Sequence, residues 1–351
     1  MSSSHPSRAA VVGAGAFGRN HLRVFRELEQ SGYPVQLVAV VDNDPHVLAE
    51  AAQHFNLPGF TSAQACLEAA GPLHLASICV PTVHHAAVAE PLLAAGVDLL
   101  IEKPLASNLA DADRILASAR AHGRIVQPGH LERFNPAVTA ARAHLNRPMF
   151  FEAHRLSIFT PRSLDVDVVL DLMIHDLDIV LSLVGSPVRE VRAVGLPVLS
   201  PKVDIANVRV EFESGCVANF TASRVSTERV RKLRFFQPHQ YLSLDFARQD
   251  LLLIDVSAAA AMDPAQLAAL AQMAQQPGVQ QPGTQHPTPG LSLKKIAVEP
   301  GEPLRLEIEA FLNAVRTRTA PAVSAQEGRA ALALALEINQ AIADHVQRTG
   351  L

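Results

Sequence analysis

Long apolar runs and clustered cysteines are both missing from this sequence. No stretch reaches the roughly 18 consecutive apolar residues of a membrane-spanning helix, so we expect no span. The three cysteines, Cys66, Cys79 and Cys216, are far apart and form neither a CxxC pair nor a zinc-ligand pattern. This usage indicates a reducing compartment and no metal site. The N-terminal residues also lack the apolar stretch of a signal peptide, so we expect a cytoplasmic protein.

An excess of charge of one sign is missing as well. The chain has 30 basic and 34 acidic residues and a formal net charge of −4, which leaves no basic footprint for nucleic acid. Hydrophobic residues make up 48% and charged residues 18% of the chain, a balance typical of a well-buried globular protein. Because 351 residues are many for one hydrophobic core, we expect two domains.

Short apolar runs alternate with helical patterns in the first third of the chain. The predicted strands are 9–12, 37–41, 76–80, 98–101 and 124–127. Helical patterns, such as those at 19–29 and 86–95, lie between them. Strands alternating with helices predict a doubly wound parallel sheet, so we assign residues 1–129 to a Rossmann α/β domain.

The pattern changes after residue 129. Longer segments alternate between apolar and polar residues, at 149–157, 188–199, 204–212, 216–224 and 240–246. Such alternation predicts an open-faced, mainly antiparallel sheet, which with its helices makes an α+β domain of residues 130–351. Its polar face is either an oligomer interface or an ordinary wetted surface. Residues 257–290, rich in Ala, Gln, Pro and Gly, are expected to form a flexible insertion, and helices at 303–316 and 324–346 close the chain.

The sequence Gly13-Ala-Gly-Ala-Phe-Gly18 follows the first predicted strand and begins a helix. Glycines at these positions allow a tight turn and bring backbone N–H groups close to a pyrophosphate. Asp42 ends the second strand, where a carboxylate binds the ribose 2′-hydroxyl of NAD and repels the 2′-phosphate of NADP. Together these features predict NAD as the cofactor. A turn-forming glycine cluster beside a surface aspartate is the alternative.

Two further polar motifs follow strands of the same sheet. Cys79-Val-Pro-Thr-Val-His-His85 comes at the end of the 76–80 strand, and Glu102-Lys103-Pro104 at the end of the next. The carboxyl ends of parallel strands are where open α/β sheets bind ligands. A lysine there is a candidate functional group, although most lysines are simply solvated.

Asp171 and His175 lie four residues apart in the almost entirely apolar segment 168–178. Residues at this spacing lie one above the other on a helix. Charged groups are seldom left in apolar surroundings unless a partner or a substrate satisfies them, so we take both as candidate site residues. A histidine satisfied within the core is the alternative.

Taken in order, the glycine fingerprint with His21, Pro81-Thr82 with His85, the EKP motif and Asp171-x-x-x-His175 resemble the Gfo/Idh/MocA oxidoreductase family over nearly the full length. The resemblance implies that Lys103 lies beside the nicotinamide, that His175 acts on the substrate hydroxyl, and that Asp171 binds substrate or orients His175. It also implies a homo-oligomer. The cofactor-binding residues it implies are Gly13, Gly15, Ala16, Phe17, Gly18, Asp42, Pro81, Thr82, His85, Glu102 and Lys103.

A narrower similarity, to the UDP-sugar branch of the family, lies at 129–137 and 234–245. It implies oxidation of the 3-hydroxyl of the GlcNAc unit of UDP-GlcNAc to a 3-keto sugar, for amino-sugar synthesis of the lipid A type. Arg133 and Asn135 are the candidates for contact with the sugar or diphosphate. Their alternative roles are a surface arginine and a helix-capping asparagine before Pro136. Two other functions stay open: a dehydrogenase of a free cyclitol or monosaccharide, and a catalytically silent NAD-binding sensor.

Overall fold

The computed structural model describes residues 6–159, 166–274 and 292–350. The chain divides into two compact units. The first unit comprises Met1–Phe134, Leu177–Ile179 and Gly301–Gln340, and the second comprises Asn135–Asp176, Val180–Pro300 and Ala341–Leu351.

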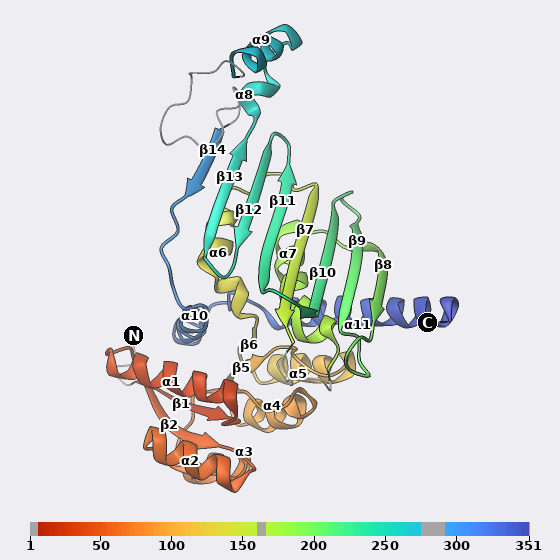
Figure 1. Cartoon of the computed structure of the whole chain (residues 1–351). Helices are drawn as coiled ribbons and strands as arrows, with labels where there is room; N and C mark the ends of the chain where they lie inside the picture. The colour runs from red at the N-terminus through yellow and green to blue at the C-terminus, as the bar shows by residue number, and fades with distance from the viewer. Residues whose placement is uncertain (1–5, 160–165, 275–291, 351) are drawn as a thin grey trace. The chain divides into compact units, whose positions relative to one another are not determined.

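A six-stranded parallel sheet forms the centre of the first unit (Figure 1). Its strands are β1 (Ser7–Val12), β2 (Val35–Val41), β3 (Gly59–Phe60), β4 (Leu75–Ile78), β5 (Asp98–Glu102) and β6 (Val126–Gly129). They are arranged in the order β3-β2-β1-β4-β5-β6, so the strand order reverses between β1 and β4. The predicted doubly wound sheet is confirmed. Only β3 was not predicted, because two residues are too short for a periodic pattern.

The helices between these strands are α1 (Ala16–Gln30), α2 (Pro45–Phe55), α3 (Ala63–Ala69), α4 (His85–Ala94) and α5 (Leu109–Ala121), with single turns η1 (Thr82–His84) and η2 (Leu131–Phe134). Three of the five α-helices begin with a side-chain cap, and α1 and α4 do not. The side chain of Asp44 caps α2, and that of Asn108 caps α5. In contrast, α1 begins after Gly15 without a side-chain cap. The first N–H groups of α1 are therefore available to a ligand.

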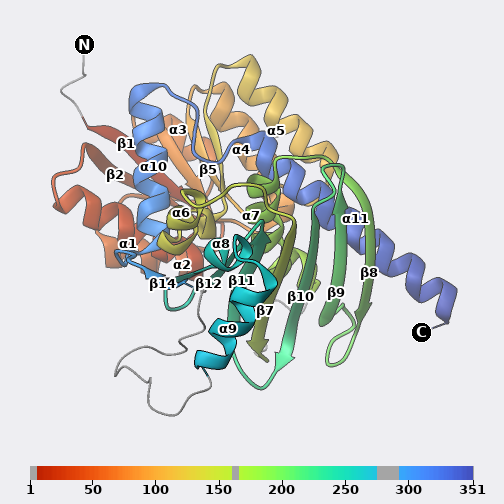
Figure 2. The same cartoon turned by 90° about the horizontal axis from the view of Figure 1, so that it is seen from above.

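Helix α10 (Pro303–Thr317) belongs to the first unit although it lies far along the chain, and it packs beside α1 (Figures 1 and 2). Its buried side chains include Leu304, Ile308 and Phe311. Each contributes about 2 kcal/mol by burial. A long connection costs little by comparison, since each doubling of loop length adds only about 0.6 kcal/mol. The predicted boundary at 129/130 remains a prediction, but in space the segment 301–340 clusters with the first unit.

The second unit contains an eight-stranded sheet in the order β14-β13-β12-β11-β7-β10-β9-β8 (Figure 1). Its strands are β7 (Phe150–Ile158), β8 (Val188–Leu196), β9 (Ile205–Phe212), β10 (Val217–Ser226), β11 (Val230–Gln237), β12 (Gln240–Asp245), β13 (Asp250–Asp255) and β14 (Ser292–Ile296). All neighbours are antiparallel except β7 and β10. This confirms the predicted fold class. The sequence patterns at β11, β13 and β14 were not predicted as strands.

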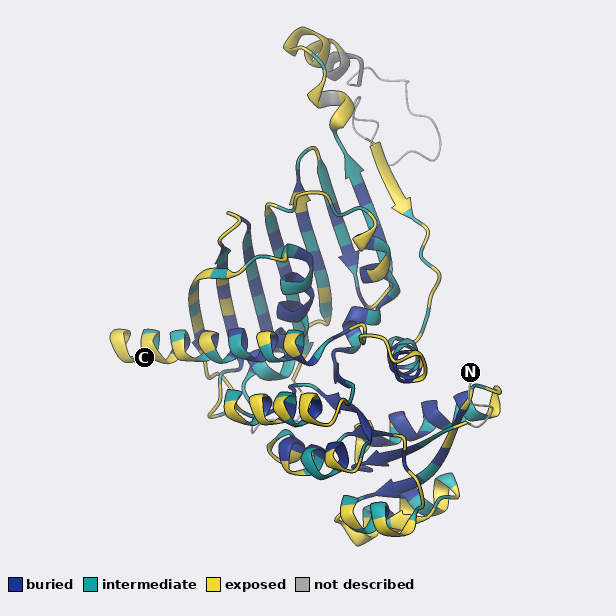
Figure 3. Cartoon of the chain, turned by 180° about the vertical axis from the view of Figure 1, so that it is seen from behind, coloured by how far each residue is buried: buried dark blue, intermediate teal, exposed yellow. Residues whose placement is uncertain are grey.

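Buried and more exposed residues alternate along these strands (Figure 3). One buried row crosses the sheet through Val208, Phe220, Ala153, Leu233 and Leu244, which are paired from strand to strand. The predicted alternation is therefore the pattern of a sheet with one packed face.

Three helical segments carry residues of the second unit, although Leu177–Ile179 of the last one cluster with the first unit. They are α6 (Pro136–Arg142), a π-helical segment (Val169–Met173) and α7 (Ile174–Val184), which continues from it. Helix α6 packs against β12 and β13, and the π-helical segment against β10. The last helix, α11 (Ala325–Thr349), contributes its residues up to Gln340 to the first unit.

The structure describes only the first part of residues 257–290, the segment predicted to be a flexible insertion. Residues 257–274 include two helices, α8 (Ser257–Ala260) and α9 (Pro264–Ala274). Asp263 and Gln266 cap α9 reciprocally, since each side chain accepts a hydrogen bond from the other residue's backbone N–H. Alanine and glutamine are also good helix formers. The rest of the predicted insertion, 275–290, lies outside the described residues. No described helix is long and apolar enough to cross a membrane.

Candidate active site

The glycine fingerprint forms the turn between β1 and α1. Gly13 has a φ of +95°, and a Cβ atom there would lie 2.6 Å from the carbonyl carbon of Cys79. A Cβ at Gly18 would lie 1.8 Å from the carbonyl oxygen of Gly13. These two positions are therefore restricted to glycine by backbone contacts. Gly15 differs, because nothing lies within 4 Å of where its Cβ would be, which leaves room for a ligand beside the start of α1.

A pocket of about 740 Å³ opens over this turn. Six of the residues predicted to bind the cofactor line it: Gly13, Gly15, Ala16, Phe17, Asp42 and Pro81. Thr61, Ser62 and Ala63, at the start of α3, also line it and were not predicted. Their pattern gave no signal because the strand before them, β3, is so short. The bare glycine cradle and the uncapped helix start fit the pyrophosphate of a dinucleotide.

Asp42 closes the pocket at the end of β2. Its Oδ2 accepts a hydrogen bond from the N–H of Ala14 at 2.7 Å, and its Oδ1 accepts one from the N–H of Asp44 at 2.9 Å. These bonds hold the carboxylate beside the glycine turn. A carboxylate at this position suits the ribose hydroxyls of NAD and disfavours the phosphate of NADP.

A buried hydrogen-bonded chain lies behind the EKP motif. The Oγ of Ser77 is 2.7 Å from Nδ1 of His21, and Nε2 of His21 is 3.0 Å from Oε1 of Glu102. Glu102 in turn accepts a 3.3 Å hydrogen bond from the backbone N–H of Lys103. Burial lowers the pKa of His21, but Cys79 and Glu102 beside it outweigh this and raise the pKa well above its ordinary value. The chain therefore supports the backbone of Lys103 from within the protein.

His85 has a structural position. It is 1% exposed, and its ring nitrogens lie 3.0 Å from the carbonyl oxygen of Val80 and 3.1 Å from that of Pro104. Burial lowers its pKa, which favours the neutral imidazole. His85 thus links the end of β4 to the loop after Lys103. Neither His85 nor Glu102 lines the pocket.

Asp171 and His175 lie on the helical segment that begins as a π-helix and continues as α7. Both side chains are partly exposed, whereas Val169, Met173 and Ile174 between and beside them are buried. Asp167 caps the start of the segment, because its Oδ1 accepts the N–H groups of Val169 and Leu170, each at 2.9 Å. The expected polar face on an apolar helix is therefore present, within a wider helical turn than the sequence predicted.

An ion pair holds this helix on the sheet. Arg155 of β7 donates from Nε and Nη2 to the two carboxylate oxygens of Asp176, each at 2.8 Å, and both residues are buried. The guanidinium also lies 5.3 Å from the ring centre of Phe246. A two-point contact of this kind fixes the rotation of a helix as well as its distance. Because Asp176 directly follows His175, the pair determines how His175 is presented.

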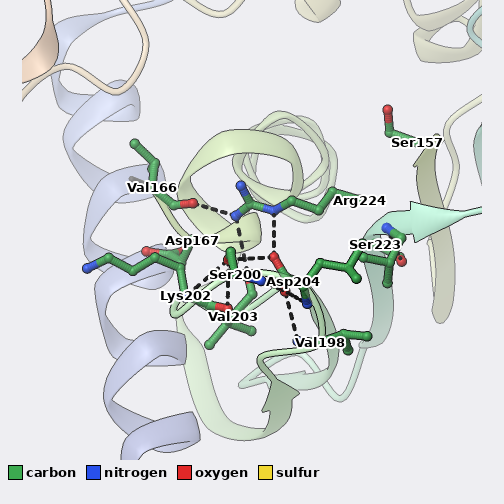
Figure 4. Close-up of polar contacts among 12 residues, drawn as sticks. Ser157, Val166, Asp167, Val198, Ser200, Lys202, Val203, Asp204, Ser223 and Arg224 are labelled. Atoms are coloured by element: carbon green, nitrogen blue, oxygen red, sulfur yellow. Dashed lines mark hydrogen bonds and ion pairs between the residues drawn. The ribbon is translucent and has the colours of Figure 1, made fainter. Parts of the chain in front are cut away.

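A second buried pair holds the chain just before the helix (Figure 4). Oδ2 of Asp204 accepts the N–H groups of Val198, Leu199 and Ser200 at 2.6–2.8 Å. Its Oδ1 lies 3.4 Å from Nε of Arg224. Arg224 also donates to the carbonyl oxygen of Val166, on the approach to the π-helical segment. The loop before β9 and the start of the helix are thus tied to one carboxylate.

Arg133 and Asn135 serve the scaffold in the described structure. Arg133 is 9% exposed and pairs with Asp178 at 3.4 Å and with Glu327 at 2.6 Å. Asn135 caps α6 by accepting the N–H of Ala137 at 3.1 Å, and its Nδ2 donates to Phe246 O. The cap formed by Asn135 is the alternative role considered from the sequence, whereas Arg133, whose alternative role was a surface arginine, is buried in ion pairs. Substrate contact by either residue stays a prediction.

The structure brings the fingerprint, Asp42 and Pro81 together around one pocket, with the Glu102–Lys103 backbone supported by His21. Thr82 lies in the turn η1 and Gly18 under the glycine turn, outside the pocket lining. Lys103 belongs to the first unit, and Asp171 and His175 belong to the second. Their assembly into one reaction centre is accordingly part of the proposal.

The two parts of the chain match an oxidoreductase family. Residues 7–130 match its NAD-binding Rossmann fold, and residues 137–237 match the GFO/IDH/MocA C-terminal domain. The chain belongs to the GFO/IDH/MocA oxidoreductase family, and the predicted NAD-binding Rossmann enzyme is confirmed.

Among its relatives, the chain is 34% identical to the UDP-N-acetylglucosamine 3-dehydrogenase of Acidithiobacillus ferrooxidans, over 97% of this chain and 99% of that protein. A solved structure of that enzyme has a TM-score of 0.82 and covers 95% of this chain and 97% of its own. An inositol 2-dehydrogenase of Acidothermus cellulolyticus is 29% identical over 55% of this chain and 58% of its own length. A levoglucosan dehydrogenase solved with NADH shares the fold, at 16% identity and a TM-score of 0.79 over 97% of this chain and 98% of its own.

Asp42→Asn tests the cofactor preference. Asparagine keeps an oxygen that accepts the N–H of Ala14 but removes the charge that repels a 2′-phosphate. We expect the ratio of the dissociation constants for NADP and NAD to fall about tenfold or more, the size of one charged hydrogen bond. Fluorescence titration of NADH and NADPH measures it. Glu50→Gln, an exposed charge change in α2, should leave the ratio unchanged, and an unchanged ratio in Asp42→Asn would contradict the assignment.

Asp204→Asn tests how the Asp204–Arg224 pair stabilises the chain before the helix that carries Asp171 and His175. Burial alone would raise the pKa of Asp204, but hydrogen bonds from Ser200, Leu199 and Val198 lower it to about 2. Since the folded pKa lies below the unfolded one, the stabilisation is complete above about pH 4 and is lost as the pH falls toward 2. We expect Asp204→Asn to lower the free energy of unfolding by roughly 2 kcal/mol at pH 7.

Urea unfolding at pH 7, 4 and 3 measures this difference. The gap between wild type and Asp204→Asn should narrow as the pH falls, whereas Glu213→Gln, an exposed acid of the same unit, should show no comparable gap. A gap that stays constant down to pH 3 would show that the charge of Asp204 is not what stabilises the loop.

Proposed function

We propose that this protein is an NAD-dependent dehydrogenase that oxidises the 3-hydroxyl of the GlcNAc unit of UDP-GlcNAc to a 3-keto nucleotide sugar. The observation that carries the proposal is the similarity to a UDP-N-acetylglucosamine 3-dehydrogenase over 97% of this chain. The site supports it, because Lys103, Asp171 and His175 supply the polar groups that oxidation of a secondary alcohol needs.

Oxidation of the alcohol removes a hydride from the carbinol carbon and a proton from the hydroxyl oxygen, and each needs its own acceptor. A bound NAD would supply the acceptor for the carbinol hydride, the C4 of its nicotinamide. We assign the hydroxyl proton to His175, because an imidazole is the side-chain type best suited to accept a proton near neutral pH. Lys103 donates a hydrogen bond to the same oxygen and stabilises developing alkoxide charge. Asp171, on the same partly exposed face as His175, orients the imidazole or holds the sugar.

The scaffold keeps these groups in fixed positions. Arg155 and Asp176 set the rotation of the helix that carries His175, and the Asp204–Arg224 pair sets the chain before Asp171. On the cofactor side, Glu102 accepts the backbone N–H of Lys103. Fixed positions matter because hydride transfer requires the reacting atoms to be held in close alignment.

The biological setting follows from the product. A 3-keto nucleotide sugar is the substrate that a transaminase needs to install an amino group, so we propose a role in amino-sugar synthesis of the lipid A type. UDP-GlcNAc is an intracellular metabolite in this scheme, and we propose a cytoplasmic homo-oligomer.

A second candidate is a dehydrogenase of a free cyclitol or monosaccharide, which the partial similarity to inositol 2-dehydrogenases favours. NADH absorbance with UDP-GlcNAc, myo-inositol and glucose, each with NAD and with NADP, separates the two. We expect NADH only with UDP-GlcNAc and NAD, and mass spectrometry and NMR of the trapped ketone should place the carbonyl at C3. Activity restricted to a free polyol would overturn the proposal. The absence of NADH with every sugar would instead favour an NAD-binding sensor.

Lys103→Met and His175→Ala test the assigned roles. Each variant should lose roughly two or more orders of magnitude in kcat, because a proton acceptor or an alkoxide-stabilising donor is removed. NAD affinity should remain within a few-fold of wild type, as measured by fluorescence titration. Lys294→Met, at an exposed lysine of β14, is the matched control and should keep full activity. A near wild-type kcat in either test variant would rule out its assigned role.

A further inference from the structure

Glu307 of α10 is a completely buried acid that the proposed reaction does not use. Its residue is 0% exposed, and it lies among apolar core residues of the same helix, Leu304, Ile308 and Phe311. Among the residues that the structure describes, neither carboxyl oxygen has a hydrogen-bond partner. The main-chain carbonyl oxygen of Glu307, by contrast, accepts a 3.3 Å hydrogen bond from Nε2 of Gln127.

The surroundings of Glu307 contain acceptors but few donors. The Oε1 of Gln127 is also buried without a described partner. Helix α10 packs against β5, whose last residue is Glu102, and the charge of Glu102 acts on Glu307. Glu102 already accepts hydrogen bonds from His21 and from the backbone of Lys103. Gly129 allows the Glu102 carboxylate to approach closely, since a Cβ there would lie 2.7 Å from Oε1.

These features favour the neutral form of Glu307. A buried carboxylate without hydrogen bonds loses its hydration, and a second negative charge near Glu102 adds repulsion. A protonated carboxyl instead carries one O–H donor, which the surrounding acceptors lack. Burial and the charge of Glu102 accordingly raise the pKa of Glu307 well above its ordinary value, while His21 acts in the opposite direction.

The other charged groups around this cluster come from several elements. Asp178 also raises the pKa of Glu307. His130, 1% exposed, lies 3.9 Å from Asp178, and its own pKa is lowered, chiefly by burial. Arg133 of η2 pairs with Asp178. In the described part of the chain no set of His, Cys, Asp and Glu residues is arranged to hold a metal ion.

We propose that Glu307 is a positioning residue that stays a neutral carboxylic acid. It thereby keeps constant the net charge around the His21–Glu102 pair and the Lys103 backbone bonded to Glu102. An ionised Glu307 would add a second negative charge near Glu102, whose carboxylate accepts the backbone N–H of Lys103. The function of the residue rests on the proposed dehydrogenase activity, but its neutrality can be tested without that activity.

Glu307→Gln replaces the acid with a neutral side chain of the same shape, and Glu309→Gln is the matched control. Glu309 lies on the same helix, partly exposed and paired with Arg305 at 2.9 Å. When the folded pKa of an acid is raised, stability is complete below the unfolded pKa and is lost as the pH rises above it. The unfolding constant of wild type relative to Glu307→Gln should therefore increase about tenfold per pH unit from about pH 4.5 upward.

Urea unfolding of the full chain between pH 5 and pH 8 measures this ratio. The same ratio for Glu309→Gln should not change with pH. If the ratio for Glu307→Gln also stays constant, the pKa of Glu307 is not raised on folding, and the proposal is overturned. Infrared spectroscopy of the folded protein at pH 7 gives an independent reading. The carbonyl stretch of a protonated carboxyl should be present in wild type and absent in Glu307→Gln.

Glu102→Gln keeps the proposal testable if Glu307→Gln does not fold. Removing the charge of Glu102 should let Glu307 ionise at lower pH. The infrared band of the protonated carboxyl should therefore disappear at a lower pH in Glu102→Gln than in wild type. A band that is absent from wild type at pH 7 would overturn the proposal. The pH dependence of kcat with UDP-GlcNAc then tests the link to Lys103.

Wild type should lose kcat at high pH as Glu307 ionises, whereas Glu307→Gln should not, with KM unchanged in both. If the chain oxidises no UDP-sugar, the unfolding and infrared results still decide the charge of Glu307. If they show a neutral acid but the two kcat profiles coincide, the acid has no part in positioning Lys103.

Discussion

The close approach of two backbones, at Gly13 on one side and Cys79–Val80 on the other, is the constraint on which the first unit depends. With a Cβ only 2.6 Å from Cys79, any side chain at Gly13 would separate the ends of β1 and β4. These are the two strands between which the strand order of the sheet reverses. The same turn leaves Gly15 open and α1 uncapped, so tight packing on one side creates the space for a dinucleotide on the other.

The polar groups behind that turn follow from the same geometry. The ends of β4 and β5 bring Ser77 and Glu102 to one edge of the sheet, and His21 of α1 lies between them. A buried imidazole between a hydroxyl and a carboxylate is well satisfied, so it rigidifies the backbone it supports. Lys103 directly follows Glu102 at the end of β5. Hydrogen bonds within the protein therefore position its backbone without a ligand.

Much of this could be predicted from the sequence because it depends on local patterns. The parallel sheet, the glycine turn, Asp42 and the Asp171–His175 face all follow from periodicity or spacing within about ten residues. The wider π-helical turn around Asp171 could not be predicted, since α and π helices place residues four apart on similar faces. Nor could the place of α10 in the first unit, because its apolar face fits any core and only the folded chain selects one.

What the sequence leaves open is which polar residues serve the scaffold and which serve a ligand. Asn135 and Arg133 follow the last Rossmann strand, where a ligand contact is expected, yet one caps α6 and the other lies in a buried ion-pair network. The sequence cannot separate these roles, because both use the same residue types at strand ends. The deciding quantity is whether the hydrogen-bonding capacity of the side chain is already used within the protein.

Glu307 shows the same rule from the opposite direction. In the sequence it is one of several acids on an amphipathic helix, and nothing in its spacing distinguishes it from Glu309. In the structure Glu309 is paired with Arg305, whereas both carboxyl oxygens of Glu307 lie buried without a partner in the described part of the chain. A carboxyl group in that position must either attract a donor or become one. The burial of a single acid thus links the packing of α10 to the charge of the group that supports Lys103.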